Sequence, residues 1–259
     1  MSLWLIPEAV RGGCGLSNVY FIRHGQAGTR DSYDSLSELG RRQASLLGEY
    51  LVAQGIEFAS AYAGGLLRQQ QTAAEVAAPY AEAGLAFPEL AVDAGWDEFD
   101  FHHVYKEIAP LICEDDEEFR REYEEVAAEV SANAGDERAD VHRRWRASDT
   151  KVVDAWVGGR YPYAGETWEQ FVARVSACRP GAGRLRREPR ENVAVFTSAV
   201  PTAIWTGRTL EVSDGHVQRL AAVLLNTSYT VLQLRAEETL LLTFNAVPHL
   251  HAPDLRTRR

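Results

Sequence analysis

The sequence predicts an α/β protein: a three-layer αβα arrangement with a largely parallel central sheet and a helical cap insertion. Short apolar segments rich in β-branched and aromatic residues alternate with longer segments whose apolar residues recur at helical spacing. This alternation is typical of a parallel sheet that is covered by helices on both faces. Over residues 102–157, in contrast, the pattern is helical without strands, which indicates a cap over a pocket.

Length and composition restrict the class of protein. A chain of 259 residues suits one sizeable domain, which we expect over residues 18–259 after a lead-in segment over residues 1–17. The formal net charge of −10 argues against nucleic acid or an anionic membrane as the partner. No apolar run approaches the roughly 20 residues that cross a bilayer. The three cysteines are odd in number and lack metal-ligand spacing, which favours a reduced, cytoplasmic setting and no metal site.

The first half of the chain contains the clearest strand. Residues 19–22 are β-branched or aromatic, and Gly25 then allows a sharp turn where this strand ends. The elements expected after it are a helix over 36–54, a strand over 58–63, a helix over 66–83 and a strand over 85–92.

The second half continues the same alternation after the cap. We expect a helix over 167–175, a strand over 193–197, a helix that begins near Pro201, and paired strands over 229–235 and 239–245. The basic patch over 184–190 is interpreted as a solvated helix end and loop.

Two strand ends carry polar groups that are suited to chemistry. Arg23 and His24 follow the first strand, and Ser198 follows the strand over 193–197. Because functional loops lie at the carboxyl ends of parallel strands, we expect these groups to face one pocket. His24 is either a nucleophile with Arg23 beside it or a buried strand-end histidine, and Arg68 is either part of an anion site at a helix N-terminus or a surface residue.

An acidic cluster follows the strand over 85–92. Asp97, Glu98 and Asp100 are framed by Trp96 and Phe99. Carboxylates beside aromatic rings can act as a general acid when desolvation tunes them, but the same pattern also fits a loop that the aromatic residues pin into the core.

Five segments, in one order along the chain, carry a family resemblance. They are Arg23-His24-Gly25-Gln26, the run Leu-Ser-Glu-Leu-Gly-Arg-Arg-Gln-Ala over 36–44, the run Leu-Arg-Gln-Gln-Gln-Thr-Ala over 67–73, Gly165-Glu166-Thr167, and the run Asn-Thr-Ser-Tyr-Thr over 226–230. Together they resemble the histidine phosphatase superfamily, which includes the cofactor-dependent phosphoglycerate mutases. The resemblance extends over roughly residues 18–245.

The resemblance implies a phosphohistidine mechanism without a metal or cofactor. His24 attacks the phosphoryl group, so its other ring nitrogen is expected to donate to a backbone carbonyl. Arg23 and Arg68 hold the phosphoryl oxygens. Glu98 is the best match for the acid that protonates the leaving oxygen, with Asp97 and Asp100 as alternatives. The further phosphate-binding residues that we expect are Gln26, Ser198 and Ala199.

One position departs from the family pattern. The family usually has a second His after the late strand, in a Ser-His-Gly sequence, whereas Ser198 stands at that position here. A hydroxyl brings one hydrogen bond but no charge, and losing a charge-assisted contact to a transferring phosphoryl group costs on the order of a hundredfold in rate. The N–H groups of Ser198 and Ala199 at a helix start compensate in part. The histidines elsewhere (His102, His103, His142 and His216) are interpreted as surface or packing residues.

Three functions remain open. The leading hypothesis is a metal-independent phosphatase for a small phosphorylated substrate, weak or specialised because of Ser198. The alternative is a non-catalytic phosphate-binding or regulatory protein, and the third is a phosphoglycerate mutase. An intact His24 beside two arginines favours the phosphatase, because a binding protein has no need of a nucleophile. The cap over residues 102–157 is expected to select the substrate.

Overall fold

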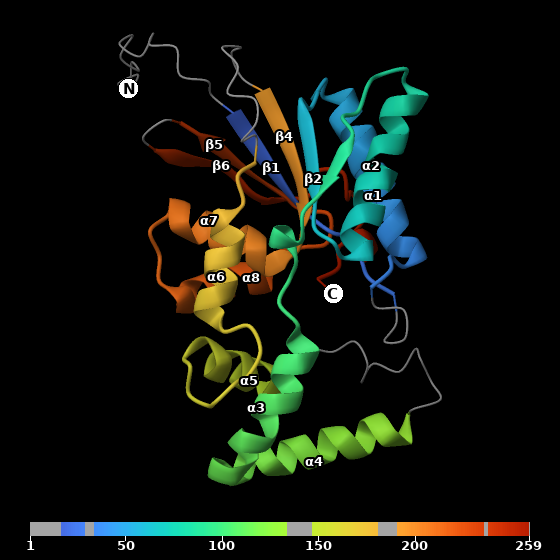
Figure 1. Ribbon diagram of the computed structural model, residues 1–259. Helices are drawn as coiled ribbons and strands as arrows, with labels where there is room; N and C mark the ends of the chain where they lie inside the picture. Colours follow the sequence, from blue (N-terminus) through green and yellow to red (C-terminus); the bar gives the residue numbers. More distant parts are fainter. Residues whose placement is uncertain (1–16, 29–33, 134–146, 181–190, 236–237, 259) are drawn as a thin grey trace, which may run out of the picture.

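A six-stranded mixed sheet forms the centre of the computed structural model, which describes residues 17–28, 34–133, 147–180, 191–235 and 238–258 (Figure 1). The strands, in their order across the sheet, are β3 (Leu90–Val92), β2 (Ser60–Ala63), β4 (Glu191–Thr197), β1 (Ser17–Arg23), β5 (Tyr229–Leu234) and β6 (Thr239–Ala246). The first four run parallel, and the last two pair antiparallel. The prediction of an α/β fold with a largely parallel sheet is confirmed.

The strand that was expected over 85–92 is shorter in the structure, and only Leu90–Val92 pairs with β2. Gly84 has a φ of 70°, and the N–H of Leu85 bonds back to the Tyr80 carbonyl, so the chain is still turning away from the preceding helix. Pro88 has no N–H to donate to a neighbouring strand. Because of these features, only the last three residues of the predicted segment form a strand.

Helices cover both faces of the sheet (Figure 1). On one face lie α1 (Glu38–Ala53) and α2 (Leu67–Glu82); on the other lie α6 (Trp168–Ala177), α7 (Ala199–Thr209) and α8 (Asp214–Val223). Helix α8 has no counterpart among the predicted elements. In β1, Ile22 packs with the α1 and α2 side, whereas Val19 and Phe21 pack with Trp205 of α7. This two-residue alternation is what a strand between two layers requires.

Three further helices lie beyond the carboxyl ends of the parallel strands, at one end of the molecule (Figure 1). They are α3 (Phe101–Asp115), α4 (Glu117–Ala132) and α5 (Ala147–Val157). Asp100 accepts a hydrogen bond from the His103 N–H and caps α3, and Asp116 caps α4 in the same way through the Phe119 N–H. These helices occupy most of the predicted cap, and the part of it over 134–146 lies outside the described residues.

Two other predicted segments also fall outside the described residues: 1–16 of the lead-in segment and the basic patch over 184–190. Within the part of the chain that the structure describes, we find no helix that is both long and apolar enough to span a bilayer.

Candidate active site

The parallel pairing of β1 with β4 brings two of the predicted site residues side by side. Arg23 is opposite Thr197 in the register, and the His24 N–H donates to the Thr197 carbonyl at 2.9 Å. His24 and Ser198 therefore lie next to each other, immediately beyond the strand ends. Gly25 follows, and a Cβ at this position would lie 2.5 Å from the carbonyl oxygen of Gly40 in α1. Only glycine lets β1 end this close to α1.

A backbone carbonyl fixes the tautomer of His24. The side chain is 4% exposed, and Nδ1 lies 2.8 Å from the Gly25 carbonyl oxygen. Because a carbonyl only accepts, Nδ1 carries the ring proton and Nε2 keeps its lone pair. Burial, with added repulsion from Arg68 and Arg23, lowers the pKa of His24 well below its ordinary value. The expected bond from His24 to a backbone carbonyl is confirmed.

Two side chains fix the backbone around His24. Thr72 accepts from the Gly25 N–H at 3.0 Å and donates to the Arg68 carbonyl at 2.7 Å. Asn226 donates through Nδ2 to the His24 carbonyl at 3.1 Å. Thr72 and Asn226 belong to two of the five segments that carry the family resemblance, 67–73 and 226–230, although the resemblance gave neither residue a role.

Arg68 links His24 to an acidic residue that sequence analysis missed. Its Nε donates to Nε2 of His24 at 3.2 Å, and its Nη1 lies 3.1 Å from Oδ1 of Asp34. The other oxygen of Asp34 accepts from the Leu67 N–H, at the start of α2. Asp34 lies in a turn without sequence periodicity, so no pattern in the sequence pointed to it.

Arg23 bonds to two backbone carbonyls, one of which is near the end of the chain. Its guanidinium donates to the carbonyls of Leu224 and Arg258. Thr257, the preceding residue, accepts from the Asn226 N–H through its carbonyl at 2.8 Å and donates to Asn226 Oδ1 at 2.9 Å. The end of the chain therefore contacts both Arg23 and the residue that supports His24.

The three candidate acids have different surroundings. Asp97 accepts from the Gly65 and Leu66 N–H groups and Asp100 caps α3, so both carboxylates bond to backbone at a helix start. Glu98 accepts from the Phe99 N–H and, at 3.1 Å, from the Val200 N–H at the start of α7. Burial raises the pKa of Glu98, against the lowering effect of these bonds and of Arg68 and Arg23. Burial also raises the pKa of Asp97.

Ser198 and Ala199 stand at the start of α7. Ser198 is the N-cap, is 1% exposed, and accepts from Nε2 of Gln69 at 2.9 Å. Ala199 is the first helical residue, so its N–H belongs to the first turn, where helical N–H groups lack intrahelical partners. Helix N-termini of this kind favour anions.

Gln26 lies against α1. Its Oε1 accepts from the Ser37 hydroxyl at 2.9 Å, and Ser37 also accepts from the Gly40 N–H as the N-cap of α1. The Gln26 side chain therefore supports the N-cap of α1, and its role in phosphate binding stays a prediction.

The other histidines contact residues outside this group. His103 pairs with Glu107 and His216 with Ser213, His102 is exposed on α3, and His142 lies outside the described residues. His249, which was not among the predicted residues, is buried, and its Nε2 lies 2.9 Å from Oγ1 of Thr227.

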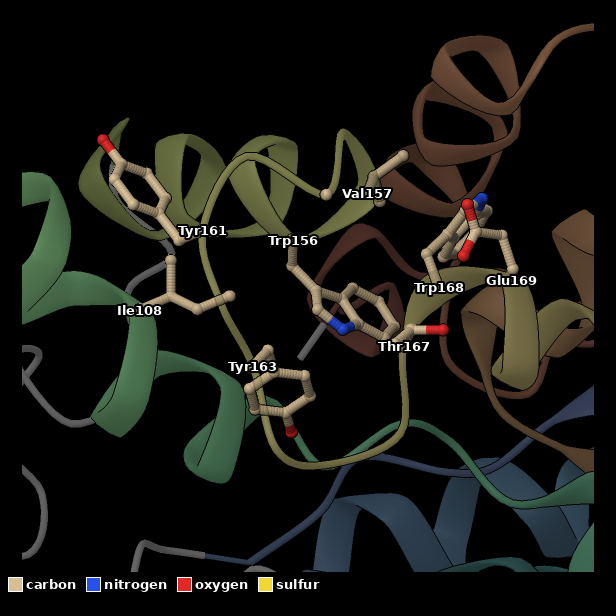
Figure 2. Close-up of a pocket in the computed structure, with 9 residues that line it drawn as sticks. Ile108, Trp156, Val157, Tyr161, Tyr163, Thr167, Trp168 and Glu169 are labelled. Atoms are coloured by element: carbon tan, nitrogen blue, oxygen red, sulfur yellow. The ribbon is translucent and has the colours of Figure 1, made fainter.

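A separate pocket of about 180 Å³ lies between the cap and α6 (Figure 2). Trp156 lies at its centre, with Ile108 and Tyr163 on one side and Thr167 and Trp168 on the other. None of its lining residues belongs to the group around His24. The two are connected through Phe99, which follows Glu98 and stacks on Trp156 with ring centroids 4.6 Å apart.

Comparison with known proteins assigns the chain to a family. A family model described as the histidine phosphatase superfamily (branch 1) matches residues 19–156 and 147–247. No curated protein is similar enough in sequence to match.

Among solved structures, Bacillus stearothermophilus YhfR is similar, with a TM-score of 0.58 at 16% identity over 91% of this chain and 100% of its own. A phosphoglycerate mutase from Bacillus anthracis has a TM-score of 0.53 at 17% identity over 92% and 96%. A mycobacterial glucosyl-3-phosphoglycerate phosphatase has a TM-score of 0.50 at 19% identity over 88% and 98%. At these identities the likeness concerns the fold alone. Since the family model covers most of the chain, this protein belongs to the histidine phosphatase superfamily.

Proposed function

We propose that this chain is a phosphatase that hydrolyses a small phosphomonoester through a phosphohistidine on Nε2 of His24, without a metal ion. The observation that carries the proposal is the state of His24: it is buried, with Nδ1 bonded to the Gly25 carbonyl and Nε2 facing the guanidinium of Arg68. A neutral imidazole with its proton on the far nitrogen is a competent nucleophile.

In the first step, the Nε2 lone pair attacks phosphorus and the bond from phosphorus to the ester oxygen breaks. Glu98, whose pKa is raised by burial, gives its proton to the leaving oxygen. Arg68 stabilises the charge on the phosphoryl oxygens, together with the N–H of Ala199 at the start of α7. Arg23, whose guanidinium is bonded to the Leu224 and Arg258 carbonyls, adds its positive charge close to His24. In the second step, water attacks phosphorus, Glu98 takes the proton of the water, and the bond from phosphorus to Nε2 breaks.

Glu98 is favoured over Asp97 and Asp100 as the acid. Both aspartates bond to backbone N–H groups at helix starts next to the site. Glu98 bonds instead to the Val200 N–H, at the start of the helix that carries Ser198 and Ala199. It is also buried close enough to both Arg23 and Arg68 for their charges to act on its pKa, whereas Arg23 does not act on Asp97.

Ser198 stands where the family pattern has its second histidine, and we assign it to the phosphoryl group as a neutral donor. This assignment makes hydrolysis slower than with two histidines, and it keeps open the alternative of a phosphate-binding protein of the same fold. It also disfavours a mutase, because a mutase must protect the phosphohistidine against water while its intermediate rebinds. We further assign the choice of substrate to the cap over residues 102–157, within a single domain that begins near residue 18.

The experiment is hydrolysis of a panel of phosphomonoesters in the presence of a metal chelator, with the native chain, His24→Ala and His216→Ala. His216 is exposed on α8 and serves as the control. Activity in the native chain and His216→Ala that is lost in His24→Ala supports the proposal, and activity retained in His24→Ala overturns it. If none of the three proteins hydrolyses any ester while the native chain binds inorganic phosphate, the binding-protein alternative replaces it.

A further inference from the structure

We propose that Gln69 is a positioning residue that fixes the Ser198 hydroxyl as a hydrogen-bond donor toward the phosphoryl group. This inference rests on the proposed function and deepens it, because it explains how a serine takes the place of a charged donor. The observations are the contacts of the Gln69 amide, the cap of α7 and the burial of both side chains.

The orientation of the Gln69 amide is set by a backbone carbonyl. Gln69 is fully buried, and its Nε2 lies 3.3 Å from the Trp96 carbonyl oxygen and 2.9 Å from Oγ of Ser198. If the amide were turned over, its oxygen would face the Trp96 carbonyl oxygen, and two acceptors would repel each other. The amide nitrogen therefore points toward both groups and gives one hydrogen to each. Ser198 accepts from Gln69, so its own proton has to point elsewhere.

Glu98, rather than the N-cap residue Ser198, accepts a hydrogen bond from the first turn of α7. A serine at the N-cap normally accepts from an N–H of the first helical turn, but Ser198 makes no such bond. The Val200 N–H donates to Oε2 of Glu98 instead. The Ser198 oxygen is therefore not needed to cap α7, and it accepts from Gln69 instead.

The Ser198 proton has no acceptor among the residues that the structure describes, although the side chain is 1% exposed. A buried donor without a partner is unfavourable, and a phosphoryl oxygen on the neighbouring His24 would supply the missing acceptor. Oε1 of Gln69 is also buried without a partner in the described part of the chain. An apolar side chain at this position would avoid the cost of burying an unpaired oxygen. The benefit of the amide therefore lies in the two hydrogen bonds that its nitrogen donates.

The test is a double-mutant cycle on the affinity for inorganic phosphate, measured by calorimetry at one pH. The four proteins are the native chain, Ser198→Ala, Gln69→Glu and the double variant. Ser198→Ala removes one hydrogen bond to an anion, so its phosphate affinity should fall about tenfold. In Gln69→Glu, measured at a pH high enough to ionise the new buried carboxyl group, the carboxylate only accepts, so the Ser198 proton turns toward residue 69 and the phosphate loses its donor.

We expect Gln69→Glu to weaken phosphate binding at least several-fold more when Ser198 is present than in the Ser198→Ala background. The added negative charge acts in both backgrounds, so the difference isolates the hydroxyl. Gln69→Met is a second variant that leaves the hydroxyl free to rotate, and it should weaken binding less than Gln69→Glu. A purely structural role would give equal losses in both backgrounds, and that result would overturn the inference.

The absence of any phosphate binding by the native chain would overturn it as well. The proposed function fails by a separate result, which is hydrolysis that survives in His24→Ala. The two failures are therefore distinguishable.

Discussion

Nε of Arg68 donates a hydrogen bond to Nε2 of His24 across 3.2 Å. The arginine that we assign to the phosphoryl oxygens thus contacts the nitrogen that we assign to the attack on phosphorus. On this assignment, we expect a phosphoryl group to lie between the two and the guanidinium to move from the ring nitrogen to the incoming oxygens. Asp34 holds Nη1 of Arg68 from the other side, which limits how far the arginine can turn. The proposed nucleophile and the proposed anion-binding arginine are therefore joined directly by a hydrogen bond.

The first prediction concerns the acid. Glu98→Gln should lower kcat on an alkyl phosphate about a hundredfold or more, because general acid catalysis typically contributes that much. The loss should be much smaller on p-nitrophenyl phosphate, whose leaving oxygen needs little help from a proton. Because the acid has to be protonated, kcat on the alkyl phosphate should fall as the pH rises through the raised pKa of Glu98. That decline should be missing in the variant.

Asp97→Asn and Asp100→Asn are the matched controls for this prediction, since each keeps an oxygen for its backbone bonds. Steady-state kinetics on both esters from pH 5 to 9 would check the result. A loss that depends on the leaving group in Asp97→Asn, but not in Glu98→Gln, would move the role to Asp97.

The second prediction concerns the end of the chain. Thr257→Val removes the bond to Oδ1 of Asn226 and the bond from Nε2 of Gln43 to the hydroxyl. Asn226 supports the His24 carbonyl, so kcat/KM should fall about fivefold, which corresponds to roughly 1 kcal/mol for one neutral hydrogen bond. Thr209→Val is the control, because its hydroxyl bonds only within α7. Equal kinetics in the two variants would mean that the end of the chain does not position the site.

Some of this architecture follows from the sequence, and some depends on contacts that no pattern encodes. The β-branched and aromatic residues over 19–22 predict a buried strand, and the strand end then places His24. The shortened β3 was missed, because its start depends on a helix end at Gly84 rather than on strand propensity.

The contacts of Gln69 and Asp34 could not be predicted either, because they also depend on packing between distant parts of the chain. Gln69 is the first of three consecutive glutamines, and only the packing of α2 against the strand ends selects which of the three side chains reaches Ser198. Asp34 reaches Arg68 from a turn that has no periodicity in its sequence. Long-range packing, which a local pattern does not record, decides both positions.

The third prediction tests the close approach of β1 to α1. In Gly25→Ala the new Cβ would lie 2.5 Å from the Gly40 carbonyl oxygen, so the strand end or the helix has to move. We expect a loss of about 1–3 kcal/mol in the free energy of unfolding and a fall in activity, because His24 is the adjacent residue. Gly215→Ala is the control, since its Cβ would meet nothing within 4 Å. In α8 this control should be neutral or stabilising by up to about 1 kcal/mol. Urea denaturation of both variants would check the difference.

The last prediction concerns acid stability. Burial lowers the pKa of His249 to about 3, with a smaller contribution from His251. The unfolded chain binds a proton at this histidine below its ordinary pKa of about 6.5, whereas the folded chain stays neutral down to about pH 3. Stability is therefore lost as the pH falls through this window, by roughly 1 kcal/mol per pH unit from this one group.

His249→Asn removes the titration while keeping a side chain that can bond to Thr227. The variant should be less stable than the native chain at pH 7.5, because a buried contact is altered, but its free energy of unfolding should fall less steeply toward pH 5. His251→Asn, at an exposed position two residues later, removes the smaller contribution to the lowered pKa of His249 and should change the slope far less than His249→Asn. Urea denaturation of the three proteins at several pH values between 5 and 7.5 would give these slopes. If native and His249→Asn slopes are the same, His249 is protonated in the folded chain, and the neutral contact with Thr227 does not hold.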